Sequence, residues 1–144
     1  MDRLRQRDRG QMKTAMTVLV VDDELMARKL IEKILVRDGY CVIQAENGAA
    51  ALEVLASNHV DIIVSDIRMP VMNGYDLLRA VRDKYPSIPV IMITAYGDTY
   101  SVKDALLLGA DEYVTKPFKS HEIALVVERT YWRILSEKQQ TGTT

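Results

Sequence analysis

Charged and hydroxyl side chains follow four short runs that are typical of strands in this chain. The run TVLVV ends in Asp22 and Asp23, and the run IIVS ends in Asp66. Thr94 closes the run IPVIMI, and Lys116 closes the run EYVT. In an open α/β sheet the carboxyl ends of parallel strands line the crevice where ligands bind, so these five side chains are expected at one site.

The chemistry of such a site follows from its charges. Three carboxylates in one crevice repel one another unless a cation is present, and oxygen ligands of this kind suit a hard ion such as Mg²⁺. Lys116 and Thr94 would supply hydrogen-bond donors to an anion, and a carboxylate beside a metal can attack a phosphoryl group. Asp66 is the candidate nucleophile. Taken alone, its stretch is equally compatible with an aspartate that caps the following turn.

The elements that must position these residues alternate along the chain. Short β-branched runs predict strands, and apolar residues at helical spacing between charged ones predict helices. We expect strands at 17–21, 40–45, 62–66, 88–94 and 112–115, and helices at 25–36, 49–56, 75–85, 101–108 and 120–137. The alternation predicts a doubly wound α/β fold, with a five-stranded parallel sheet and five helices.

The motifs VVDDE, SDIRMPVMNG, MITAYG and YVTKPF, in this order at strand ends, resemble the receiver domains of two-component response regulators. The resemblance spans about residues 17–135 and implies the flavodoxin-like strand order 2-1-3-4-5 for the sheet. Each motif alone is weak, because DD and KP pairs are common, but the ordered set is specific.

The resemblance implies a role for each residue at the metal site. Asp66 is the phosphoacceptor, which takes a phosphoryl group from a histidine kinase, and it also contacts Mg²⁺. Asp23 binds Mg²⁺ directly and Asp22 binds it largely through water. The backbone carbonyl of Arg68 is a further ligand.

The resemblance also implies how a phosphoryl group would be sensed. Thr94 would bond to a phosphoryl oxygen and Lys116 would pair with it, aimed by a cis peptide bond before Pro117. Tyr113 matches the switch aromatic of the family, whose ring turns inward as the threonine moves. That movement changes the face made by the fourth helix, the fifth strand and the fifth helix; an ordinary half-buried tyrosine is the alternative.

Two further pairs of residues have candidate roles. Arg68 and Tyr96 occupy the variable positions two residues after the phosphoacceptor and two after the threonine, where bulky side chains would shield an acyl phosphate from water. In the last helix, Ile123, Val126, Val127, Thr130 and Ile134 form the expected inward face. Leu125 and Trp132 fall on the opposite face among charged residues, which favours a partner surface.

Composition and length bound the remaining possibilities. A chain of 144 residues, 48% apolar and 27% charged, suits one soluble domain. We expect a flexible basic arm at 1–16, a receiver domain at 17–137 and a disordered tail at 138–144. The net charge of -1 gives no global nucleic-acid signal, and no apolar run could span a membrane, so a cytoplasmic location is expected. Cys41 allows no internal disulfide and is expected to be buried.

The expected function is a phosphorylation-dependent switch that acts through protein contacts. Its partners would be a sensor histidine kinase or phosphotransfer protein and a downstream target or a second copy, with no direct nucleic-acid or membrane binding. It would catalyse only its own phosphorylation and dephosphorylation, and too few residues follow the last helix for an output module. The alternatives are a phosphorylation-independent binding module, or a phosphotransferase or hydrolase acting on a diffusible substrate, for which the short connections offer no covering loop.

Overall fold

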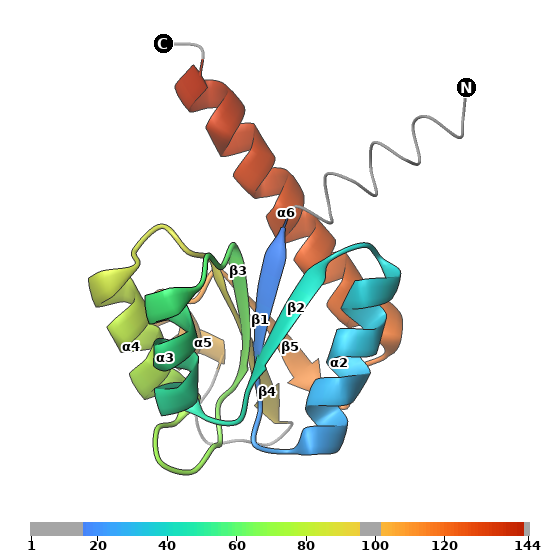
Figure 1. Cartoon of the computed structure of the whole chain (residues 1–144), viewed down its shortest axis with the longest axis vertical. Coiled ribbons are helices and arrows are strands. Elements are labelled where there is room, and N and C mark those ends of the chain that lie inside the picture. The colour runs from blue at the N-terminus through green and yellow to red at the C-terminus, as the bar shows by residue number, and fades with distance from the viewer. Residues whose placement is uncertain (1–15, 96–101, 143–144) are drawn as a thin grey trace.

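The computed structural model in Figure 1 describes residues 16–95 and 102–142. All pairings within its sheet are parallel, and the strand order is β2-β1-β3-β4-β5, which confirms the predicted order 2-1-3-4-5. The strands are β1 (Thr17–Val21), β2 (Cys41–Ala45), β3 (Ile62–Asp66), β4 (Val90–Ala95) and β5 (Glu112–Lys116).

Helices cover both faces of the sheet. α2 and α6 pack on one face, and α3, α4 and α5 lie on the other (Figure 1). The helices are α2 (Leu25–Arg37), α3 (Gly48–Ser57), α4 (Gly74–Lys84), α5 (Val102–Leu107) and α6 (Ser120–Gly142).

The core lies in two layers, one on each face of the sheet. Successive side chains of a strand point to opposite faces. Val18 and Val20 of β1 therefore join the layer under α2 and α6, while Leu19 and Val21 join the layer under α3 and α4. The central strands are buried on both faces, which is why their sequences are unbroken apolar runs.

Three apolar side chains are more exposed than the helical spacing and strand pattern predicted. Leu25 and Leu30 of α2 are each 50% exposed, because the buried stripe of this helix is narrow and consists of Ile31, Ile34 and Leu35. Cys41 is exposed rather than buried, so the expectation for it was wrong. It is the first residue of the edge strand β2, where one side of the strand has no neighbour.

Helix α6 runs beyond its expected end. The apolar spacing predicted an end near Glu137, whereas the helix continues to Gly142 and projects past the sheet (Figure 1). The residues of the expected arm lie outside the described part of the chain except Met16, which is buried and accepts a hydrogen bond from the Cys41 amide. Within the described residues, none of the helices is both long and apolar enough to cross a bilayer.

Candidate functional site

The carboxyl ends of β1, β3 and β5 bring an acidic cluster and a lysine together. Carboxylate oxygens of Asp22, Asp23 and Asp66 lie within 4.8 Å of one another. Lys116 Nζ lies 3.2 Å from Asp66 Oδ2 and 3.7 Å from Asp22 Oδ2. Asp22 is fully buried and Asp66 is 8% exposed, while Asp23 opens to solvent. The topology therefore assembles the residues that the sequence placed in one crevice.

Each buried carboxylate of this cluster is held by the backbone next to it. Asp22 Oδ1 accepts a hydrogen bond from the Glu24 amide at 2.9 Å, and Asp66 Oδ1 accepts one from the Ile67 amide at 2.8 Å. The second oxygen of Asp22, Oδ2, is buried and has no hydrogen-bond partner among the described residues; Lys116 Nζ, at 3.7 Å, is beyond hydrogen-bond distance. An orphaned buried acceptor in a set of three carboxylates fits a hard divalent cation with bound water.

Burial and like charge both act on these carboxyl groups. Burial is the main cause that raises the pKa of Asp22, and the neighbouring charge of Asp66 adds to it. Burial also raises the pKa of Asp66, against the opposing pull of Lys116. Burial alone would lower the pKa of Lys116, but the charges of Asp66 and Asp22 outweigh it and raise that pKa, so the ammonium stays charged. One ammonium faces three carboxylates, which leaves an excess negative charge for a cation.

Thr94 lies between the reactive groups at the same edge of the sheet. It is 3% exposed and is the second-last residue of β4, the strand between β3 and β5. The register pairs Asp66 with Ile93 and Lys116 with Ala95. The hydroxyl-bearing residue is thus at the level of both charged groups.

The other residues of the predicted site are distributed around this edge. Arg68 is exposed and, with Asp23, lines an open cavity of about 410 Å³ beside the cluster. The peptide bond between Lys116 and Pro117 is cis. Tyr113 is 40% exposed on β5. Tyr96 lies outside the described residues.

The loop between β3 and α4 is fixed by a close backbone approach. A Cβ atom on Gly74 would lie 2.3 Å from the carbonyl oxygen of Asp66, so only glycine fits there. The Gly74 amide donates to the Ile67 carbonyl at 2.8 Å, and Asn73 caps α4 through the Asp76 amide. The local sequence does not reveal this need for glycine, because the approach of Gly74 to Asp66 depends on tertiary packing.

The α6 residues predicted for a partner surface are both exposed. Leu125 is 58% exposed and Trp132 is 48% exposed, whereas Val127 on the inner face is fully buried. The Trp132 ring meets the ring of Tyr131 edge to face at 5.2 Å. Tyr131 is 2% exposed and packs against Tyr40, although the helical wheel did not include it in the inward face.

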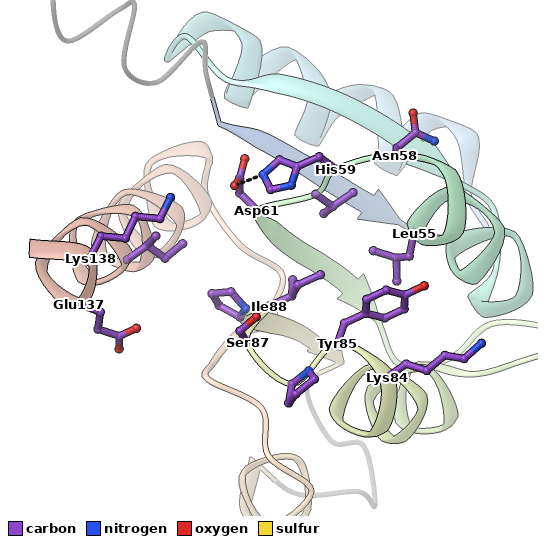
Figure 2. Close-up of a pocket in the computed structure, with 14 residues that line it drawn as sticks. Leu55, Asn58, His59, Asp61, Lys84, Tyr85, Ser87, Ile88, Glu137 and Lys138 are labelled. Carbon is purple, nitrogen blue, oxygen red and sulfur yellow. Dashed lines mark hydrogen bonds and ion pairs between the residues drawn. The ribbon is translucent and has the colours of Figure 1, made fainter. Parts of the chain in front are cut away.

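A larger cavity, of about 640 Å³, lies at the opposite end of the sheet, beside the amino ends of β3 and β4. Among the described residues that line it there is no group of three carboxylates like the one at the carboxyl ends. Figure 2 shows its lining, in which the imidazole of His59 bonds to Asp61 at 2.8 Å and Tyr85 and Lys138 come from different helix ends. The volume of a cavity therefore does not identify the functional site. The site is identified by the charged side chains that converge at the carboxyl ends of the strands.

Comparison with known proteins gives a consistent result. A family model described as response regulator receiver domain matches residues 18–128. The DNA-binding transcriptional regulator NtrC of Escherichia coli K12 is 39% identical over 122 residues, which cover 85% of this chain and 26% of NtrC. This chain thus spans about a quarter of the length of that relative.

Solved structures agree with the family match. The chemotaxis response regulator CheY4 of Vibrio cholerae is 31% identical with a TM-score of 0.74, and the alignment covers 80% of this chain and 98% of CheY4. NtrX of Brucella abortus, solved in complex with ADP, is 28% identical with a TM-score of 0.83. That alignment covers 89% of this chain and 30% of NtrX.

Proposed function

This chain belongs to the receiver domains of two-component response regulators, which are phosphorylation-dependent signalling switches, and we propose that it is switched by phosphorylation of Asp66. The observation that carries the proposal is the junction of three carboxylates and Lys116 at the carboxyl edge of the sheet. Receiver domains are regulatory rather than catalytic toward other substrates. The chemistry proposed here is confined to the chain's own aspartate.

In the proposed transfer, a carboxylate oxygen of Asp66 attacks the phosphorus of a phosphohistidine or small acyl phosphate. The bond from phosphorus to the donor nitrogen or oxygen breaks, and its electron pair leaves with the donor. Asp22, Asp23, Asp66 and the Arg68 carbonyl would hold Mg²⁺, which neutralises the charge that develops on the phosphoryl oxygens. Lys116 Nζ, 3.2 Å from Asp66 Oδ2, is near enough to pair with the phosphoryl group afterwards.

The phosphoryl group would be sensed next to the acceptor. The phosphoryl group carries about 1.5 to 2 negative charges and brings new acceptor oxygens, so a hydroxyl within reach gains a hydrogen bond by moving toward it. Thr94 is the buried hydroxyl at that level of the sheet, and Tyr113 lies on the neighbouring strand. We place the responding surface over α5, β5 and α6, where Leu125 and Trp132 are exposed.

Receiver domains of this family interact with histidine kinases and downstream effectors, and the proposed partners follow from that. A sensor histidine kinase or a phosphotransfer protein would supply the phosphoryl group. The surface that includes Leu125 and Trp132 would bind a downstream protein or a second copy of the chain. We propose residues 17–137 as the receiver unit.

The experiment is incubation with acetyl phosphate and MgCl₂, followed by intact mass. We expect the mass of one phosphoryl group on the wild type, and none on Asp66→Asn or in EDTA. Asp61→Asn is the matched control, because Asp61 lies at the opposite end of the sheet, where it accepts a hydrogen bond from the amide of Thr17, the first residue of β1. Phosphorylation of Asp66→Asn to the same extent would refute the assignment. No phosphorylation of a folded wild type would favour a phosphorylation-independent binding module.

A further inference from the structure

A chain of side-chain hydrogen bonds runs from the surface of α2 to the backbone of the acidic cluster. Arg28 on α2 donates through Nη1 to the carbonyl oxygen of Asp22 at 2.6 Å and through Nε to Gln44 Oε1 at 3.0 Å. Gln44, on β2, donates through Nε2 to Glu32 on α2. All three side chains are partly buried.

These bonds hold Asp22 from outside its own loop. Its amide donates to the carbonyl of Ala45, the last residue of β2, at 3.2 Å, and its Oδ1 accepts from the Glu24 amide in the following loop. The carbonyl of Asp22 is restrained by Arg28. Its Oδ2 is the atom left for a cation and its waters. The backbone position of Asp22, and with it the position of Oδ2, is therefore set in part by the Arg28 guanidinium, which is itself held by Gln44.

Gln44 is the residue that anchors this guanidinium. Its amide accepts from Arg28 with one end and donates to Glu32 with the other, which a leucine of similar volume cannot do. Its strand pairs with β1 through the register of Gln44 with Val20, two residues before Asp22. The anchor thus lies on the strand next to β1, the strand that Asp22 directly follows.

We propose that Gln44, through Arg28, is a positioning residue that sets the affinity of the acidic cluster for Mg²⁺. The inference rests on the proposed function, since that function requires Mg²⁺ at Asp22 and Asp23. It extends the site to a side chain on the edge strand that does not touch the metal. Partners that orient the ligands of a metal commonly change its affinity in this way.

Charge and position can be separated at this site. Removal of Arg28 would take away a positive charge near the cluster, and this change in charge alone would strengthen cation binding. It would also remove the bond that positions Asp22, which should weaken cation binding, so an Arg28 variant mixes two opposite effects. Gln44→Leu leaves every charge in place and removes both hydrogen bonds of the amide. We expect it to weaken Mg²⁺ binding about fivefold, the effect of one hydrogen bond.

The measurement is isothermal titration calorimetry of the full chain with MgCl₂ and no phosphoryl donor. The swapped pair Glu32→Gln with Gln44→Glu keeps the total charge and restores an acceptor for Arg28, so it should bind within twofold of the wild type. Val42→Ala, which shortens a partly buried side chain of the same strand, controls for a general loosening of β2. With acetyl phosphate as the donor, the phosphorylation rate of Gln44→Leu should be below that of the wild type at low Mg²⁺ and should equal it at saturating Mg²⁺.

Two results would overturn the inference alone. One is a Gln44→Leu affinity within twofold of the wild type. The other is an equal loss in Val42→Ala, or in the swapped pair, which would assign the effect to strand stability. A wild type that binds no Mg²⁺ would instead overturn the metal site of the proposed function, and with it the inference.

Discussion

At the residue scale, ionisation of the acidic cluster opposes the stability of the metal-free protein. Asp22 is fully buried, and burial together with Asp66 raises its pKa above the ordinary value of 3.8. The folded state therefore binds a proton more tightly than the unfolded state does. The contribution of this group to the free energy of unfolding is therefore most favourable at low pH, where the carboxyl is protonated. That contribution is lost as the pH rises through the raised pKa of the folded state.

Asp22→Asn should consequently stabilise the protein in EDTA at pH 7. We expect the free energy of unfolding to rise by about 1–3 kcal/mol, because a buried charge is replaced by a neutral amide of the same shape. Urea unfolding at pH 7 and pH 5 measures it, and the gain should shrink at the lower pH. A stability equal to the wild type at pH 7 would contradict this account of the cluster.

Arg68 belongs to the same scale because its proposed role is to shield the acyl phosphate. It is exposed beside Asp23, at the rim of the cavity next to the acidic cluster. We expect Arg68→Ala to hydrolyse its phosphoryl group about threefold faster, since water reaches the site more easily. Arg79→Ala, on the outer face of α4, serves as the control. Loss of phosphoprotein is followed by intact mass, and an unchanged half-life would reject the role.

At the element scale, the β3–α4 connection depends on one glycine. Its missing Cβ allows the first turn of α4 to lie against the backbone of Asp66. We expect Gly74→Ala to cost about 2–4 kcal/mol and to slow phosphorylation by acetyl phosphate, because the backbone that carries the acceptor must shift. Urea unfolding and the phosphorylation rate are the measurements.

Gly109→Ala is the comparison for this variant. Gly109 has φ of 99°, where a Cβ is strained, and it lies at the end of the α5 segment far from Asp66 in the fold. We expect a cost of about 1 kcal/mol with an unchanged phosphorylation rate. If both variants slow phosphorylation equally, the close approach at Gly74 has no special effect on the site.

At the scale of the whole molecule, the site joins three strands that are distant in sequence. A cation that binds Asp22, Asp23 and Asp66 links β1 to β3 and is available only in the folded state. Mg²⁺ at about one hundred times its dissociation constant should raise the free energy of unfolding by about 2.7 kcal/mol. Thermal unfolding with and without MgCl₂ measures the shift. An equal shift in Asp23→Asn would place the ion elsewhere.

The exposed face of α6 also acts at this scale. Trp132 and Leu125 lie on the side of the helix that faces away from the sheet, and Arg129 near them pairs with Glu112 of β5 through two bonds of 2.9 Å. We expect the phosphorylated wild type to sediment as a dimer and Trp132→Ser to remain a monomer. Analytical ultracentrifugation with acetyl phosphate and MgCl₂ tests this, with Leu106→Ser of α5 as a comparison on the adjacent helix. A phosphorylated wild type that stays monomeric would contradict dimerisation through Leu125 and Trp132 and would favour a different protein as the partner of this surface.

The sequence by itself determined the alternation of elements and the end of the sheet at which the acids meet. The strand order followed from the resemblance of its motifs to receiver domains. Short strand-forming runs ending in Asp22, Asp66 and Lys116 are local patterns, and the geometry of parallel sheets brings their ends together in a shared site. The outward position of Trp132 was also readable, because helical spacing is local.

Tertiary structure decided the features that depend on distant neighbours. The exposure of Leu25 reflects the narrow buried stripe of α2, and the exposure of Cys41 reflects its place at the start of the edge strand β2. The need for glycine at position 74, and the bonds from Gln44 through Arg28 to Asp22, arise only when separate elements meet. Apolar periodicity is a property of one element, whereas a hydrogen bond between elements depends on how those elements pack, and no local pattern encodes it.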